Sequence, residues 1–453
     1  MGKTLLFIGS EKAITNFYRY GYSEKFLSPK LIIATTKNIA EKFPRVKREL
    51  IFSTNWNYKD TSTLHLYFLF RNFFQKTNLP LSYELRNRLF GPYKITNPKI
   101  FFFSCKYFMK TFFLINWIFF LKNFKLSNHA FLKALREKNL IGLGDVEIYK
   151  NLIIKHSISK IITFTPFRDP KLYDLAEACE ISNCELHIFP ECWDNFSSGY
   201  GLPDKISKIN VWSKQQLSEI KQFYPNQVKN VNIVGSYRRA YAAERVEPKK
   251  KLSSEVLRIL YLEGYFYEDL NYVLNKILVA ITNLGNCPKN IEITVRSYPL
   301  KRQTVNYQNR NTWYEKWIGK IDFNGINVII NKSFDVDLDF DFQDKDLVIS
   351  ELTTAGLEAC FREIPTFFIG SHSSKRYLDS ARAFNFSFAN DLVKDGLYTN
   401  LSRYNGVEQF SRKLSLLMNQ KINNLTLKEN KLDIDFYSEI FNFEFWENLI
   451  SSN

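Results

Sequence analysis

Short apolar runs alternate with helical stretches along the chain, and this alternation limits the possible folds more than any other feature of the sequence. In the first half, the strand-like runs are residues 5–8, 31–34, 50–52, 161–164, 186–189, 209–212 and 231–234. Helical patterns, such as residues 172–179 and 215–223, fill the gaps between them. Apolar runs of this length are typical of parallel strands that helices cover on both faces. The pattern predicts an α/β fold built from successive βα units.

The same alternation restarts after a polar segment, which indicates a second α/β domain. Strands are expected at residues 257–262, 291–295, 328–330, 347–350 and 366–369, with helices at 270–284 and 355–361. A chain of 453 residues is also longer than one hydrophobic core usually organises. Residues 237–252 are charged, contain a proline and lack apolar periodicity, so we expect the linker there.

Three regions follow from these patterns. We expect an N-terminal domain at residues 1–240, with an aromatic and basic insertion at about residues 97–138, and a C-terminal domain at residues 252–435. Residues 436–453 have an aromatic helical pattern and are expected to form a helix that packs back on the N-terminal domain.

The insertion and the positive net charge both suggest partners that carry negative charge. Lysines divide the insertion into apolar pieces shorter than the roughly 20 residues that a membrane span needs. It is therefore expected to be either a buried core helix or a helix lying in the headgroup region of an anionic membrane. The chain has 62 Lys and Arg against 46 Asp and Glu, a net charge of +16. This excess favours anionic partners, although AT-rich codons alone would also enrich Lys.

Several classes of site have no sequence support. The six cysteines contain no C-x-x-C pair and no histidine at zinc-ligand spacing, so neither a disulfide framework nor a structural zinc is expected. A reducing cytosol fits this usage best. The first apolar run begins at Thr4, so no secretory signal is expected. No P-loop, G-x-S-x-G or H-E-x-x-H motif occurs.

The segment from residue 346 to residue 370 carries the most chemical information. A buried strand ends at Ser350, and a helix opens near Thr354 after a turn of small hydroxyl residues. The N–H groups and the dipole of a helix N-terminus bind phosphate, and Ser350, Thr353 and Thr354 add hydroxyl donors. Glu358, one turn into the helix, can accept hydrogen bonds from a ribose. Alternatively, a threonine simply caps the helix and Glu358 is solvated.

This order of elements resembles a known family. A strand, the run Ser-Glu-Leu-Thr-Thr-Ala-Gly-Leu-Glu-Ala, a helix, Ile-Pro and a second strand are similar to the donor-nucleotide motif of GT-B glycosyltransferases. The resemblance is to the members that build bacterial capsules and surface polysaccharides. It implies two Rossmann-like domains facing across a cleft, with the nucleotide sugar on the C-terminal domain. It also implies that the nucleotide sugar is a co-substrate and that no cofactor or metal is needed.

Other residues of the C-terminal domain are assigned to the donor through this resemblance. Arg296 follows the strand at residues 291–295, where related enzymes often carry an Arg or a His-Pro element, and it can make bidentate phosphate contacts. Ser-Tyr stands here in place of the usual His, which leaves the nucleotide type open. Gly264 would allow close approach of the backbone to a diphosphate, and His372 could approach the donor. The alternative for Arg296 is an exposed charge at a strand end.

The N-terminal domain contains a Trp-Asp-Asn segment that resembles the surface-polysaccharide transferases. It follows the strand at residues 186–189, and loops at the carboxyl ends of strands bind ligands in open α/β sheets. We therefore expect Asp194, or less favourably Glu191, to be the general base for the acceptor. Asn195 and Ser236, the latter in a Val-Gly-Ser element, are expected at the cleft. Ordinary turn chemistry is the alternative for the Asp-Asn run.

Two further features are assigned structural roles. The acidic run at residues 335–341 has the D-x-D spacing of metal sites, but a solvated acidic loop is favoured. His187 is expected to be a buried strand residue and not a base.

The sequence therefore predicts a glycosyltransferase that moves a sugar from a nucleotide-sugar donor to a surface-glycan or lipid-linked acceptor. We expect it in the cytoplasm, peripheral at the anionic inner face of the cytoplasmic membrane. The alternatives are a nucleotide-sugar epimerase of the same fold and a non-catalytic protein that binds lipid or nucleic acid. No nucleic-acid-binding signature is present, so a nucleic-acid partner is not expected.

Overall fold

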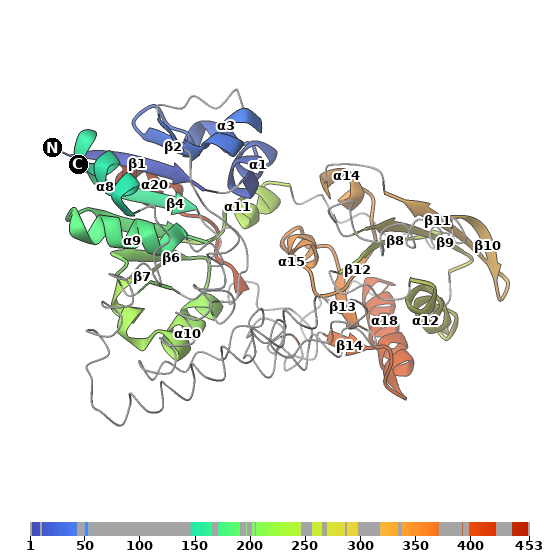
Figure 1. Ribbon diagram of the computed structural model, residues 1–453. Coiled ribbons are helices and arrows are strands. Elements are labelled where there is room, and N and C mark those ends of the chain that lie inside the picture. Colours follow the sequence, from blue (N-terminus) through green and yellow to red (C-terminus); the bar gives the residue numbers. More distant parts are fainter. Residues whose placement is uncertain are drawn as a thin grey trace, which may run out of the picture. The chain divides into compact units, whose positions relative to one another are not determined.

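The computed structural model describes residues 2–9, 11–42, 50–52, 146–164, 171–190, 196, 202–203, 205–245, 256–264, 270–285, 288–297, 318–333, 338–370, 392, 398–422 and 437–451. The chain forms two compact units. Unit 1 comprises Met1–Gly235, Ala383–Phe386 and Phe441–Asn453, and unit 2 comprises Ser236–Arg382 and Ser387–Ile440. Within these residues, each unit has a seven-stranded sheet with helices packed against it (Figure 1). The predicted α/β class with two Rossmann-like domains is confirmed.

Unit 1 has a parallel sheet with the strand order β3-β2-β1-β4-β5-β6-β7. Its strands are β1 (Lys3–Ile8), β2 (Ile32–Thr36), β3 (Leu50–Phe52), β4 (Ile158–Phe164), β5 (Glu185–Phe189), β6 (Lys208–Val211) and β7 (Val231–Ile233). Its helices are α1 (Glu11–Arg19), α2 (Ser23–Phe26), α3 (Lys37–Lys42), α8 (Val146–Lys155), α9 (Lys171–Ile181), α10 (Lys214–Phe223), the 3-10 helix η1 (Pro225–Asn230) and α20 (Phe443–Ser451).

The described strands of unit 2 have the order β10-β11-β9-β8-β12-β13-β14, and among them only the pairing of β10 with β11 is antiparallel. Its strands are β8 (Val256–Leu262), β9 (Asn290–Arg296), β10 (Gly319–Phe323), β11 (Ile326–Lys332), β12 (Leu347–Ser350), β13 (Thr366–Gly370) and β14 (Tyr398–Asn400). Its helices are α11 (Tyr237–Ala243), α12 (Leu270–Thr282), α14 (Leu338–Phe342), α15 (Thr354–Phe361) and α18 (Gly406–Ile422).

Both sheets reverse their strand order at one point. In unit 2 the chain builds β8, β9 and β11 outwards in one direction, and then returns to place β12 on the other side of β8. Ligands bind outside the carboxyl ends of the two strands that flank such a switch point. In unit 2 these strands are β8 and β12, and in unit 1 they are β1 and β4.

The strands expected from the sequence are present at or near their expected positions, and the sheet of unit 2 has two more, β10 and β14. β10 and β11 form an edge hairpin whose two-residue turn is Asn324-Gly325, with φ values of 55° and 80°. Both turn residues have positive φ, as a type I′ turn requires, and Asn-Gly is a preferred sequence for it. The Asn-Gly pair is therefore the local signal for this hairpin.

The start of the expected linker is a helix, so that prediction is wrong for residues 237–243. These residues form α11, which belongs to unit 2 and contacts α15. Arg238 lies buried in α11 because a carboxylate far along the chain neutralises its charge. From the neighbouring residues alone, such a charged residue is predicted to be exposed to solvent, because its partner lies far away in the sequence.

An aromatic layer joins α20 to the sheet of unit 1. The ring of Trp446 is 4.9 Å from that of Phe26 and 5.7 Å from those of Phe164 and Phe189. Its indole Nε1–H donates a hydrogen bond to the carbonyl of Lys25 at 3.1 Å. A buried Trp needs such an acceptor for its N–H group. α20 thus completes the core of unit 1, although it follows unit 2 in the chain.

No helix within the described ranges has both the length and the apolar character needed to cross a bilayer. The aromatic and basic insertion expected at about residues 97–138 lies outside the described residues.

Candidate functional site

The switch point of unit 2 is built around a buried carboxylate, Glu351. Glu351 follows the last residue of β12 and is 4% exposed. It accepts hydrogen bonds from the hydroxyl of Tyr261 at 2.5 Å and from the backbone N–H of Gly264 at 2.9 Å. These contacts link the carboxyl ends of β8 and β12. Glu351 is not among the residues predicted from the sequence, because its role depends on which strands are neighbours.

Gly264 lies where the sequence predicted close approach to the backbone. A Cβ atom at Gly264 would lie 2.5 Å from Oε2 of Glu351, so a side chain here would displace the carboxylate. In this structure, the group that approaches Gly264 is therefore Glu351. Contact of Gly264 with a donor diphosphate stays a prediction.

The turn after β12 leads directly into α15. Thr353 has extended backbone angles and its hydroxyl accepts the N–H of Gly356 at 3.3 Å, so Thr353 is the N-cap. The buried Ser350 hydroxyl donates to the carbonyl of Glu351 at 2.6 Å and lies 3.1 Å from the Thr353 hydroxyl. Capping uses one N–H group, whereas a helix N-terminus has four without an intrahelical partner. The half-buried Thr354 begins the helix.

Gly356 allows α15 to pack closely on the sheet. A Cβ atom at Gly356 would lie 2.6 Å from the Ser350 hydroxyl oxygen and 2.6 Å from Cε1 of Phe368. A glycine at a helix start in a dinucleotide-binding fold has the same effect on helix–strand packing. The close packing holds the N-terminus of α15 at the carboxyl end of β12.

Glu358 is buried and forms an ion pair, so the alternative of a solvated helix residue is wrong. Its Oε1 accepts a hydrogen bond from NH1 of Arg238 at 2.9 Å, and each side chain is 6% exposed. Arg238 lies in the first turn of α11, which the buried Ser236 caps by accepting the N–H of Arg238 at 3.2 Å. A ribose contact for Glu358 and a cleft position for Ser236 stay predictions.

Residues 338–341 of the acidic run are not the solvated loop that the sequence predicted, because they lie in α14 and two of their carboxylates form ion pairs; residues 335–337 lie outside the described residues. Asp341 in α14 pairs with Arg296 and accepts the hydroxyl of Ser333 at 2.8 Å. Asp339, two residues earlier, pairs with Arg362 at the end of α15 and accepts the hydroxyl of Tyr241. The partners Arg296, Arg362 and Tyr241 are 45, 23 and 98 residues away in the chain, so the charges of the neighbouring residues do not reveal them.

Arg296 therefore lies at the carboxyl end of β9 and is oriented by Asp341. Its side chain is 20% exposed, so it is neither an unpaired surface charge nor fully buried. Within the described part of the chain, no three His, Cys, Asp or Glu side chains are grouped as metal ligands.

Of the residues predicted for the acceptor side, Ser236 is described and caps α11. Glu191, Asp194 and Asn195 lie outside the described residues, as does His372 of the donor set. Phe196, which follows Asn195 in the chain, is described, and it is hydrogen-bonded to Glu219 of α10 and to Tyr224.

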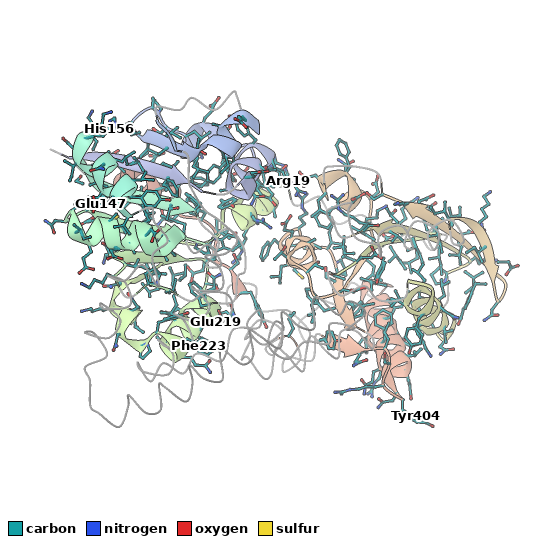
Figure 2. The ribbon with its side chains drawn as sticks, in the orientation of Figure 1. Arg19, Glu147, His156, Glu219, Phe223 and Tyr404 are labelled. Carbon is teal, nitrogen blue, oxygen red and sulfur yellow. The ribbon has the colours of Figure 1, made fainter. Side chains whose placement is uncertain are left out.

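Two side chains hold the peptide groups of Phe196. Its N–H donates to Oε2 of the buried Glu219 at 2.8 Å, and its carbonyl accepts the hydroxyl of Tyr224 at 2.8 Å. Figure 2 labels Glu219 on α10. The second oxygen of Glu219 accepts the side-chain amide of Gln215 at 3.3 Å. Glu219 thus fixes the chain directly after the Asp-Asn run.

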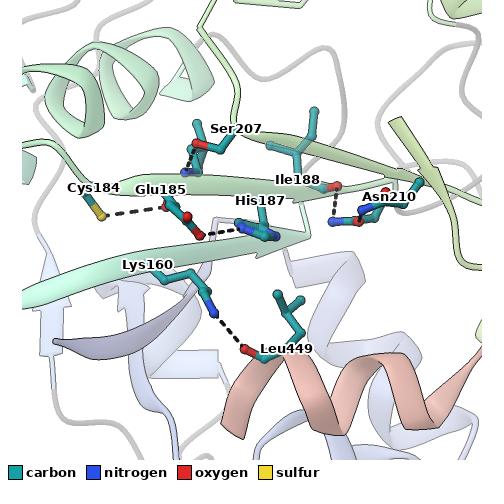
Figure 3. Close-up of polar contacts among 10 residues, drawn as sticks. Lys160, Cys184, Glu185, His187, Ile188, Ser207, Asn210 and Leu449 are labelled. Atoms are coloured by element: carbon teal, nitrogen blue, oxygen red, sulfur yellow. Dashed lines mark hydrogen bonds and ion pairs between the residues drawn. The ribbon is translucent and has the colours of Figure 1, made fainter. Parts of the chain in front are cut away.

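His187 is a buried residue of β5, as the sequence predicted (Figure 3). Its Nε2 is 3.1 Å from the carboxylate of Glu185. Burial lowers the pKa of His187, partly offset by Glu185, and the nearby Lys160 and Lys208 lower it further. The buried Lys160 donates to the carbonyl of Leu449 in α20 at 3.0 Å.

No family model matches the chain, and no curated protein matches it. Among solved structures, it is similar to a protein from Listeria monocytogenes described as a UDP-N-acetylglucosamine 2-epimerase, with a TM-score of 0.50 and 8% identity over 96% of this chain and 94% of that one. It is also similar to the wall teichoic acid polymerase TagF, with a TM-score of 0.45 and 10% identity over 99% and 88%. A third structure is the spinosyn rhamnosyltransferase SpnG complexed with thymidine diphosphate, with a TM-score of 0.42 and 11% identity over 99% and 99%.

At these identities the likeness concerns the fold. The match to the Listeria protein extends over nearly the whole of both chains and agrees with the two sheets described above. The chain therefore has the GT-B fold, with two Rossmann-like domains.

Proposed function

We propose that this protein is a glycosyltransferase that moves a sugar from a nucleotide-sugar donor to a surface-glycan or lipid-linked acceptor. The observation that carries the proposal is the position of the Thr353-capped helix α15, whose N-terminus follows β12 at the switch point of unit 2. Open α/β sheets bind their ligands there, and a helix N-terminus attracts phosphate. The run from Ser350 to Ala359 is also the part of the sequence that resembles the donor motif.

The donor is bound by unit 2 in this proposal. The first turn of α15, with Thr353 and Thr354, stabilises the charge that develops on the departing nucleotide, because its dipoles are fixed before reaction. Arg296 adds a guanidinium that Asp341 orients, and Glu358 accepts the ribose hydroxyls.

The acceptor is bound by unit 1, where Asp194 or Glu191 removes the proton of the acceptor hydroxyl. General-base catalysis requires the carboxylate to be held within hydrogen-bond reach of that hydroxyl. The anchoring of Phe196 by Glu219 supports this assignment, since it fixes the position of the chain directly after the Asp-Asn run.

An epimerase acting on a nucleotide sugar is the second candidate, favoured by the likeness to the Listeria protein over most of both chains. Both candidates bind a nucleotide sugar in unit 2. They differ in whether the sugar leaves the nucleotide for an acceptor or returns to it as an isomer.

A panel of radiolabelled nucleotide sugars, incubated with the purified protein with and without membrane extract, separates these functions. Transfer of label to the extract supports the glycosyltransferase, and an isomerised donor without extract supports the epimerase. A protein that is stabilised by no member of the panel and forms neither product contradicts both. A ligand at 100 times its Kd adds about 2.7 kcal/mol to the free energy of unfolding, so melting temperature identifies the donor first.

Two matched variants test the donor site. Arg296→Lys keeps the charge but loses bidentate geometry, so we expect weaker donor binding. Arg258→Lys changes the same residue type near the amino end of β8, where Arg258 is 39% exposed, and should leave binding unchanged. Equal donor affinity in both variants would contradict the role of Arg296.

We further propose that the protein is peripheral at the inner face of the cytoplasmic membrane, held there by the basic and aromatic insertion. A protein held mainly by charge is released by high salt, because salt screens the attraction to anionic lipid. The Debye length falls from about 10 Å at 0.1 M salt to about 3 Å at 1 M salt, so a wash at the higher concentration is the test. Release from the membranes supports the proposal, and full retention contradicts it.

A further inference from the structure

A buried arginine on α11 holds the carboxylate of Glu358. Arg238 and Glu358 are 120 residues apart in the chain, and their 2.9 Å hydrogen bond joins α11 to α15. Both side chains are almost completely buried. Removing two charges from water is costly, and an apolar pair of similar volume often stabilises a protein as well or better. Stability alone therefore gives little reason for this pair.

The position of the pair relates it to the donor site. Glu358 lies one turn behind the N-terminus of α15, so its carboxylate is on the helix that begins at the switch point. Arg238 contacts Oε1, and a carboxylate has about four lone-pair positions on its two oxygens, so it can accept further hydrogen bonds. A planar guanidinium bound to one carboxylate oxygen also restricts the rotation of the group.

The segment that carries Arg238 is itself fixed. Ser236, at the start of unit 2, caps α11, and its N–H donates to the carbonyl of Glu439 at 2.8 Å. Arg238 therefore approaches Glu358 from a backbone with defined hydrogen bonds.

We propose that Arg238 is a positioning residue, which orients the carboxylate of Glu358 to accept the ribose hydroxyls of the donor. This inference rests on the proposed function and adds a residue to it. Arg238 does not itself contact the donor. It acts only through Glu358, and it therefore controls how well the protein distinguishes a ribose from a sugar that lacks a hydroxyl group.

The test compares the nucleoside diphosphate that binds the wild type with its 2′-deoxy and 3′-deoxy analogues. We expect the wild type to bind the ribonucleotide about 10-fold or more tightly than at least one of the two deoxy analogues. This is the usual effect of a hydrogen bond to a charged group on affinity. Arg238→Lys, which keeps the charge but changes its position, should reduce this preference several-fold. Arg239→Lys on the same helix is the matched control and should keep the preference.

A double variant protects the test against misfolding. Arg238→Met combined with Glu358→Met replaces the ion pair by an apolar pair, which is expected to fold because neither charge is left buried alone. It should bind the ribonucleotide and its deoxy analogues equally. The double variant should also match Glu358→Met alone, because Arg238 has no further effect once Glu358 is gone.

The outcomes separate this inference from the proposed function. If the wild type binds no nucleoside diphosphate, the proposed function fails. If the wild type binds the deoxy analogues as well as the ribonucleotide, or the Arg238 variants discriminate as well as the wild type, the donor site stands and the inference is overturned. A several-fold smaller preference in Arg238→Lys, with the Arg239→Lys control unchanged, supports the inference.

Discussion

Replacing Gly356 by alanine tests whether the close approach of α15 to the sheet is required. Alanine favours a helix interior over glycine by about 1 kcal/mol, so helix propensity alone predicts stabilisation. However, the added Cβ would lie 2.6 Å from both the Ser350 hydroxyl oxygen and Cε1 of Phe368. Both neighbours are buried and cannot move without displacing the sheet. Overpacking of this kind costs about 1–3 kcal/mol, so we expect a net loss of about 1–2 kcal/mol.

The same substitution at Gly285 is the control. A Cβ atom at Gly285 would meet open space, and this residue lacks the positive φ that favours glycine. Gly285→Ala should therefore be neutral or stabilise by up to about 1 kcal/mol, because alanine reduces the entropy of the unfolded chain.

Thermal unfolding and nucleotide titration provide the two measurements. A loss of about 1–2 kcal/mol corresponds to a melting temperature roughly 2–8 °C lower for a unit of this size. Donor affinity should fall as well, because the helix N-terminus moves away from the carboxyl end of β12. If Gly356→Ala is as stable as Gly285→Ala and binds the donor equally well, the packing argument is wrong.

Three further predictions concern unit 1. Trp446→Ala removes a ring that contacts three aromatic neighbours, so urea unfolding should show a loss of about 3–5 kcal/mol; an effect no larger than that of Tyr404→Ala, at a fully exposed position, would refute this. The pKa of His187 is lower in the folded protein than in the unfolded chain, so the folded state favours the neutral imidazole. The free energy of unfolding should therefore be unaffected by His187 above about pH 6.5, and should decrease as the pH falls from there towards the folded pKa, because the unfolded chain binds the proton more tightly. His187→Gln should flatten the dependence of melting temperature on pH, and an unchanged slope would contradict the assignment. Glu219→Gln replaces one of two buried acceptors by a donor, so it should cost about 1–3 kcal/mol and lower the rate of sugar transfer; full activity would show that the anchor at Phe196 is dispensable.

The fold could be predicted because most strands contain a short run of mainly apolar, buried residues, such as residues 161–164 of β4 and residues 347–349 of β12, and such runs are visible in a short window of sequence. The strands that were missed have different patterns. β10 alternates partly buried with exposed residues at a sheet edge, and β14 is the run Tyr398-Thr399-Asn400, which contains no aliphatic residue. Apolar runs identify buried strands, and edge strands need the turn signal as well.

The candidate site was predictable only where its chemistry is local. The Thr353 cap and the start of α15 follow from neighbouring residues, and both are present. The partners of Glu358 and Glu351 come from other elements, so only the strand order and helix packing reveal them. For the same reason, the sequence around Arg238 predicts a linker.

The order of the chain has a consequence for synthesis. α20 leaves the ribosome only after every residue of unit 2, yet Trp446 fills the aromatic layer of unit 1. Domains usually fold in the order in which they are made. Here the core of unit 1 cannot be completed until unit 2 has been synthesised, because Phe26, Phe164 and Phe189 lack their contact with Trp446 until then. A premature stop codon shortly before α20 would therefore damage the unit that was made first.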